Sequence, residues 1–136
     1  MNRPQVIPYA QGIRSLTEAD VEFTITAEEE DTPIKGSFSS GDDAADAELE
    51  KSIRDDYNAG NEWAWCCVKV TGTWVPTEDV SLVASAYLGA CSYKSQRDFI
   101  ECNDYCKDLK AEVLDELNKK LSACAEAIEC LREPQS

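Results

Sequence analysis

The chain contains no histidine, and this absence excludes the commonest chemistry of small enzymes. Histidine is the usual general base at neutral pH, the usual partner of serine or cysteine nucleophiles, and the commonest nitrogen ligand for metals. The six glycines are scattered and form neither a dinucleotide-binding fingerprint nor a phosphate-binding loop. Paired carboxylates could serve a glycosidase, but no motif marks a specific pair. We therefore predict a protein that is not an enzyme and has no cofactor.

Basic residues are scarce as well, since 13 lysines and arginines stand against 27 acidic residues, for a net charge of -14. A broadly negative surface repels nucleic-acid phosphates and anionic membranes. No run approaches the roughly 18 apolar residues that span a bilayer, and no apolar segment follows Met1–Gln5 as a signal peptide requires. We predict a soluble cytoplasmic protein with no direct nucleic-acid or membrane partner. Its charge either attracts basic proteins or only keeps the chain soluble.

The seven cysteines form an odd set in a chain without a signal peptide, which indicates free thiols in a reducing compartment. Neighbouring Cys66 and Cys67 would point to opposite faces of a strand, and Cys102 and Cys106 lie one helical turn apart. These spacings favour burial over the short knuckles of thiolate zinc sites. We predict no metal site, with Cys102, Cys106 and Cys124 as the alternative ligand set.

The length and the 43% hydrophobic content predict one domain over residues 1–136, and its strand and helix patterns predict the α+β class. The expected sheet is small and antiparallel, with three to four strands. Alternating residues predict strands near 21–26, 61–75 and 82–93, and a short one near 34–38. Gly89 marks a bulge or a close approach. Residues 1–19 read as an irregular arm with a helical turn near Thr17–Asp20, and residues 133–136 as a loose tail.

Two helices are expected to pack on this sheet. The shorter covers 43–58, is capped by Ser40 or Asp42, and ends at Gly60. Its apolar stripe consists of Ala45, Leu49, Ile53 and Tyr57. The longer pattern covers 96–132 with a break near Asn103, and its stripe consists of Cys102, Cys106, Leu109, Val113, Leu117, Leu121, Cys124, Ile128 and Leu131.

Three tryptophans, Trp63, Trp65 and Trp74, lie within the strand predicted at 61–75. On an open sheet face they could stack nucleic-acid bases. Only Lys69 lies among them, however, and such a face needs many cations. We therefore expect Trp63 and Trp65 to belong either to the core or to the apolar centre of a protein interface.

Clustered acidic residues are the best functional signal. Residues 28–56 contain eleven acidic and three basic residues, a local net charge of -8. On the long helix, like charges four residues apart repel each other, a cost that a surface shaped only for stability would avoid. The predicted partner is a basic nucleic-acid-binding protein or nucleoprotein complex, and the alternative is a merely solvated face. The candidate binding residues are Asp42, Asp43, Asp46, Glu50, Asp55, Asp56, Glu101, Asp104, Asp108, Glu112 and Asp115.

The stretches GNEWAWCCVKVTGTW (60–74) and YLGACSYK (87–94), with Asp98 and Phe99 after them, resemble a family of small proteins encoded by phages and mobile elements. The resemblance covers roughly residues 20–125 and implies no catalytic residues. It implies a context in which small acidic proteins act as inhibitors of anti-CRISPR or anti-restriction type. The resulting hypothesis is a DNA-mimic-like protein that blocks a basic surface of a host defence complex. The alternative is a structural or assembly protein that homo-oligomerises, for example as a dimer through the tryptophan face or the long helix.

Overall fold

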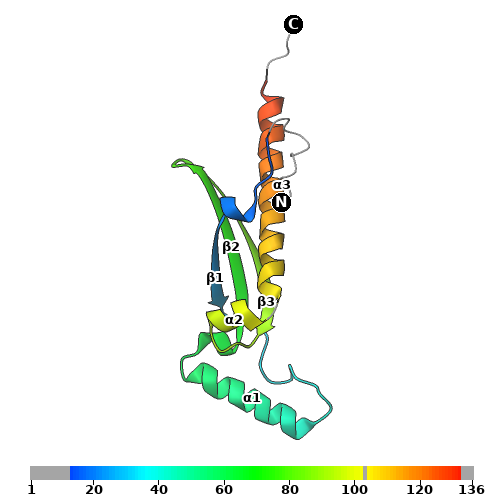
Figure 1. Ribbon diagram of the computed structural model, residues 1–136. Coiled ribbons are helices and arrows are strands. Elements are labelled where there is room, and N and C mark those ends of the chain that lie inside the picture. Colours follow the sequence, from blue (N-terminus) through cyan, green and yellow to red (C-terminus); the bar gives the residue numbers. More distant parts are fainter. Residues whose placement is uncertain (1–12, 103, 133–136) are drawn as a thin grey trace.

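The computed structural model describes residues 13–102 and 104–132 and shows an α+β fold (Figure 1). The predicted class is thereby confirmed, with three strands in the order β1-β2-β3, all antiparallel. Most of the predicted arm (residues 1–12) and the predicted tail (133–136) lie outside the described residues. None of the described helices is both long and apolar enough to cross a bilayer. The elements in chain order are η1 (Glu18–Asp20), β1 (Glu22–Glu28), α1 (Asp43–Asn58), η2 (Glu62–Ala64), β2 (Cys66–Thr77), β3 (Val80–Cys91), α2 (Gln96–Cys102) and α3 (Tyr105–Cys130).

The sheet has one apolar face and one polar face, as the alternation predicted. In β2, Cys66, Val68 and Val70 are buried while the residues between them are only partly covered. Helix α3 packs against β2 and β3 on the apolar face. On the polar face, Thr71 and Ser85 share a hydroxyl hydrogen bond of 3.0 Å across the two strands.

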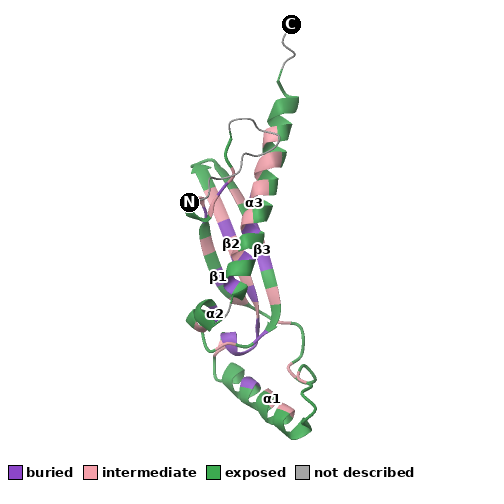
Figure 2. Ribbon diagram, turned by 45° about the vertical axis from the view of Figure 1, so that its right-hand side comes forward, coloured by how far each residue is buried: buried purple, intermediate pink, exposed green. Residues whose placement is uncertain are grey.

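The apolar stripe of α3 is buried for only part of its length. Leu109, Val113 and Leu117 are buried against the sheet, as predicted, and the break near residue 103 is confirmed by the end of α2 at Cys102. The prediction is wrong beyond Leu121, because α3 continues past the sheet and its last turns are exposed (Figure 2). The predicted stripe members that the structure shows as exposed are Cys102, Cys124, Ile128 and Leu131.

The segment before β2 differs from the predicted strand. Residues 62–64 form a 3-10 turn, so Trp63 and Trp65 are both buried and do not form a separate face. Trp63 stacks on Phe99 with ring centroids 6.1 Å apart, and the Trp65 indole N–H donates to the Thr32 carbonyl at 2.8 Å. Both tryptophans therefore belong to the core.

The predicted short strand at 34–38 is absent from the described chain. The Ser37 amide donates to the Ile34 carbonyl at 3.2 Å, which makes this segment a turn. The ring of Phe38 lies against Trp65 with centroids 6.2 Å apart. The segment therefore forms a turn whose Phe38 covers the Trp65 indole, and it adds no fourth strand to the sheet.

Helix α1 has the predicted bounds but not the predicted packing. The Asp42 side chain caps it by accepting from the Ala45 amide at 3.1 Å. Past its end Gly60 adopts a φ of 107°, a left-handed conformation that favours glycine. Only Ile53 of the stripe is buried, because α1 packs on η2 beyond the end of the sheet (Figures 1 and 2). Leu49 and Tyr57 stay 45% and 42% exposed.

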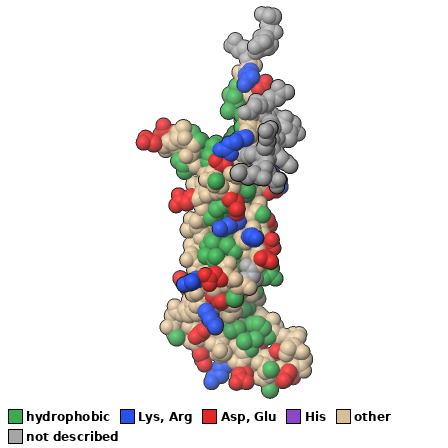
Figure 3. All heavy atoms as spheres, viewed as in Figure 1, with side chains coloured by type: hydrophobic (Ala, Val, Ile, Leu, Met, Phe, Trp, Pro, Cys, Tyr) green, Lys and Arg blue, Asp and Glu red, His purple; other side chains and the backbone are tan. Residues whose placement is uncertain are grey.

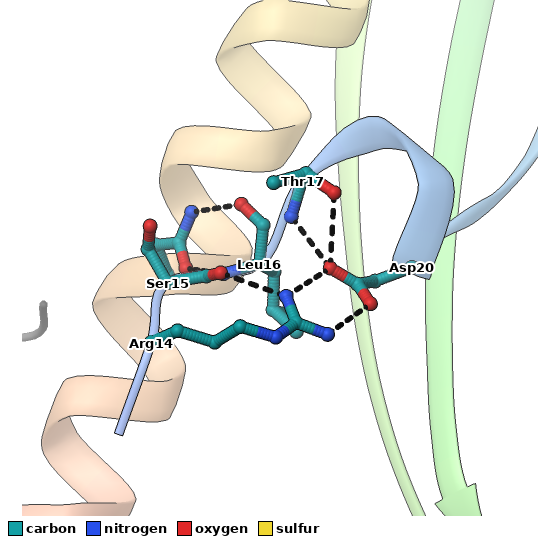
Figure 4. A network of polar contacts seen from close by, with 6 residues as sticks. Arg14, Ser15, Leu16, Thr17 and Asp20 are labelled. Carbon is teal, nitrogen blue, oxygen red and sulfur yellow. Dashed lines mark hydrogen bonds and ion pairs between the residues drawn. The ribbon is translucent and has the colours of Figure 1, made fainter. Parts of the chain in front are cut away.

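Segment 13–21 is held to α3 and to itself by polar contacts (Figure 4). Arg14 donates two hydrogen bonds to the Asp20 carboxylate, at 2.7 and 2.6 Å. Asp20 also accepts from the Thr17 amide at 2.8 Å, which confirms the predicted helical turn. Leu16 exchanges backbone hydrogen bonds with the Asn118 side chain at 2.7 and 3.1 Å. The Arg14 contact holds the pKa of Asp20 well below its usual range.

The predicted irregularity at Gly89 is confirmed as a β-bulge. The register of the β2–β3 pairing shifts between the Cys66–Cys91 and Val68–Leu88 pairs, so β3 carries an extra residue there. Ala90 takes the positive φ of 54°. The Glu30 carboxylate accepts a hydrogen bond from the Ala90 amide, which ties the loop after β1 to the bulge.

Candidate functional site

The outward face of α3 carries the carboxylates predicted there. Asp104, Asp108, Glu112 and Asp115 are all exposed, because the buried stripe turns the opposite side of the helix to the sheet. They extend over about 16 Å at about 1.5 Å per residue. Lys119 ends the row by pairing with Asp115 at 3.2 Å, a contact that raises the pKa of Lys119.

Three of the predicted acidic residues hydrogen-bond to the backbone at the start of α1 or in the loop before it. Asp42 caps the helix, as described above. Asp46 accepts from the amide and hydroxyl of Ser40 at 3.1 and 2.7 Å, and Glu50 accepts from the amide of Gly36 at 3.1 Å. Asp46 and Glu50 lie on the same side of α1 as the buried Ile53 and are only partly exposed. These three carboxylates therefore position the preceding loop.

Two other predicted carboxylates each pair with a basic residue of their own helix. Asp55 lies 4.0 Å from Lys51, and Glu101 accepts from the Arg97 guanidinium at 3.0 Å. Such exposed pairs contribute little to stability and screen their charges only in part. The predicted residues that are exposed and have no partner among the described residues are Asp43, Asp56, Asp104, Asp108 and Glu112. We call Asp104, Asp108 and Glu112 the α3 row.

Figure 3 shows how these charges are distributed on one face of the molecule. Acidic side chains occur along its whole length, and lysines and arginines are interspersed among them. Helix α1 lies across the end of the sheet from which α3 starts, so the acids of α1 do not extend the α3 row along one line (Figures 1 and 2). This face therefore carries short acidic segments with bases between them.

The cysteines are spread over several elements. Cys66 and Cys91 are buried opposite each other on β2 and β3, and burial raises their thiol pKa values to about 12 and about 11. Cys102 is exposed, and its thiol donates to the Asp98 carboxylate at 2.9 Å. Within the described ranges no group of three or more cysteine and acidic side chains could hold a metal ion, so the alternative ligand set is not brought together.

A cleft that the sequence pattern did not indicate lies beside the outer edge of β1. It has a volume of about 460 Å³ and is lined by strand residues 25–28 together with Glu62, Trp63 and Gln96. The Gln96 side chain donates to the Ile25 carbonyl at 2.6 Å. Residues 25 and 96 are far apart in sequence, so no local motif could have identified this site.

Comparison of the chain with protein-family models, curated proteins and solved structures found no match.

Proposed function

We propose that the protein is a non-enzymatic acidic binding protein that acts in the host cytoplasm of a phage or mobile element. It blocks a basic nucleic-acid-binding surface of a host defence complex, as a DNA-mimic-like inhibitor of anti-CRISPR or anti-restriction type. The observation that carries the proposal is the α3 row, in which Asp104, Asp108 and Glu112 are exposed and have no basic partner among the described residues. Asp43 and Asp56 on α1 are likewise exposed and have no basic partner among the described residues.

The α3 row suits this role because a packed helix holds it rigidly. Its carboxylates stand about 6 Å apart, sparser than the charges of duplex DNA, so the imitation is of a short stretch of one strand. Preorganised charges lose little conformational entropy on binding. The net charge of -14 speeds the encounter with a basic groove, and added salt weakens it.

The test is competition for a basic nucleic-acid-binding complex of the native host. A labelled duplex is displaced from an RNA-guided surveillance complex or a restriction enzyme at low and at high salt. The triple variant D104N/D108N/E112Q is compared with E22Q/E78Q/D79N, which removes the same charge from β1 and the β2–β3 turn. We expect the first variant to lose about tenfold or more in competition and the second to stay within about twofold. Equal losses, or no low-salt binding to any complex tested, would contradict the proposal.

A second candidate function, assembly through self-association, is favoured by the exposed end of α3. Ile128 and Leu131 are 61% and 83% exposed, and with Leu121 and Cys124 they repeat at the alternating spacing of three and four residues found in coiled coils. The positions on either side of this apolar seam, which are the e and g positions of the heptad, carry no carboxylate, although the protein is strongly acidic. These flanking residues are Lys120, Ala125, Ala127 and Arg132.

This end of the helix suits a second copy in antiparallel orientation, because the acidic bodies then lie at opposite ends. Sedimentation of the wild type over a range of concentrations separates the two functions. Assembly would be favoured by a dimer that is lost in I128E/L131E and kept in E126Q, in a wild type that does not bind basic complexes. A protein that stays monomeric at high concentration would contradict the assembly function.

A further inference from the structure

The outer edge of β1 is an unpaired strand edge within the described part of the chain. β1 pairs with β2 on one side only. The Ile25 carbonyl points to the other side, where it accepts from Gln96. In an antiparallel strand the N–H and C=O groups of alternate residues point the same way, so those of Phe23 and Ala27 also point outward. No described residue pairs with the outward groups of Phe23 and Ala27.

The space beside this edge can hold a further chain. The cleft of about 460 Å³ is lined by residues 25–28 of the strand and also by Glu62 and Trp63. A second cleft of about 170 Å³ adjoins it, since both are lined by Ala27, Glu28 and Glu62. Gln96 already occupies the Ile25 carbonyl, so the backbone groups that stay open to a fourth strand beside the cleft are those of Ala27.

The charge around the two clefts specifies the chemistry of the occupant. Glu28, Glu29 and Glu62 line them, and no lysine or arginine does so among the described residues. The ring of Tyr57, which is 42% exposed, lines the smaller cleft with Trp65. Carboxylates attract cations, and aromatic faces attract lysine and especially arginine.

A second copy of the chain paired antiparallel about Ile25, the centre of β1, is disfavoured. If two β1 strands paired antiparallel about Ile25, Glu22 of each would lie opposite Glu28 of the other. Like charges directly opposite each other on paired strands are destabilising.

We propose that the outer edge of β1 binds an extended cationic polypeptide segment as a fourth strand of the sheet. Its backbone pairs with Ala27, and its lysine or arginine side chains reach Glu28, Glu29 and Glu62. Main-chain pairing supplies affinity, and the carboxylates select a basic sequence. The site shares no residue with the α3 row, so either binding surface can exist without the other.

The experiment uses the full chain and an eight-residue capped peptide of alternating lysine and valine. Controls are the same peptide with glutamate in place of lysine, and a backbone N-methylated form that cannot pair. We expect the lysine peptide to bind by fluorescence anisotropy, and the amides of Phe23, Ile25 and Ala27 to gain hydrogen-exchange protection. Both control peptides should bind at least about tenfold more weakly.

Two variants test the backbone and charge contributions separately. Ala27→Pro removes an outward N–H without disturbing the pairing with β2, and should weaken binding about fivefold. Val83→Pro makes the same change on the outer edge of β3, where Lys120 donates to the Val83 carbonyl at 2.6 Å, and should leave binding within about twofold. E28Q/E62Q should weaken binding about tenfold, with E22Q/E48Q as the charge-matched control.

Several results would overturn the proposal. Equal binding of the N-methylated peptide would show attraction by charge without strand pairing, and peptide effects confined to the α3 row would place binding elsewhere. Protection of the outward amides of Phe23, Ile25 and Ala27 without peptide would mean that the edge is already occupied, by a second copy if the protection depends on concentration and by residues 1–12 if it does not. The variant D104N/D108N/E112Q should leave peptide binding unchanged. A failure of the inhibitor proposal can therefore be told apart from a failure of strand pairing at β1.

Discussion

Gly72 sits where α3 comes closest to the sheet, and replacing it by alanine should destabilise the protein. A methyl group placed there would lie 2.5 Å from Cγ1 of Val113, 2.9 Å from Cγ1 of Val21 and 3.3 Å from the Phe23 ring. Val113 is completely buried, so it cannot turn into solvent to make room. Helix and strand must therefore separate by a few tenths of an ångström or more.

The expected loss follows from two opposing effects. Overpacking a core costs about 1–3 kcal/mol. Removing a strand glycine returns about 0.5–1 kcal/mol, because the unfolded chain loses freedom. The net loss should be about 1–2 kcal/mol, which corresponds to a fall in Tm of about 4–7 °C for a chain of this size.

The assay is urea and thermal unfolding followed by circular dichroism on Gly72→Ala, Val113→Ala and the double variant. Val113→Ala alone should cost about 2–3 kcal/mol. The double variant should be more stable than the two single losses predict, by about 1 kcal/mol or more, because the new methyl group occupies the vacated space. Gly89→Ala is the comparison: a methyl group there meets no core side chain within 4 Å but lies 3.0 Å from Oε1 of Glu30, so any loss should come from the Glu30–Ala90 contact and not from overpacking. A Gly72→Ala variant as stable as the wild type, or strictly additive losses, would refute the close contact.

Three further predictions follow from single contacts. The hydrogen bond from the Ala90 amide lowers the pKa of Glu30, so the Glu30 carboxylate stabilises the fold above its unfolded pKa of about 4.3, and this contribution is lost as the pH falls below that value. Glu30→Gln should therefore be less stable than the wild type at pH 7. Urea unfolding should show this difference in stability shrinking toward pH 3. Trp65→Phe loses the indole hydrogen bond and about 1 kcal/mol of unfolding free energy, whereas Trp74→Phe, which breaks no hydrogen bond in the described structure, should cost less. Iodoacetamide at pH 8 should alkylate Cys66 and Cys91 at least about a hundredfold more slowly than the exposed cysteines, and similar rates by mass spectrometry would contradict their burial. The exposed cysteines are Cys102, Cys124 and Cys130.

Local features of this fold could be predicted from the sequence because each depends on near neighbours. The bounds of α1 follow from the cap at Asp42 and the glycine at position 60. The alternation in β2 and the bulge at Gly89 likewise depend on residues within a few positions. Outward exposure of the α3 row was predicted for the same reason, since helical periodicity alone separates it from the buried stripe.

Tertiary structure decided what covers each element, and pattern alone could not supply this. Leu117 and Ile128 belong to the same apolar stripe, yet Leu117 is fully buried and Ile128 is 61% exposed, because the strands end before the helix does. Asp46 and Asp108 have the same side chain at similar helical positions, but only Asp46 meets the backbone of a returning loop.

The cleft beside β1 shows the same division most clearly. Glu28 and Glu62 are ordinary acidic residues in the sequence, separated by a long loop and a helix. They line one cleft because η2 folds back beside the edge of β1. Periodicity reports only which side of an element is apolar. Which surfaces meet depends on chain segments that are distant in sequence, and the length of each element sets how far that contact extends.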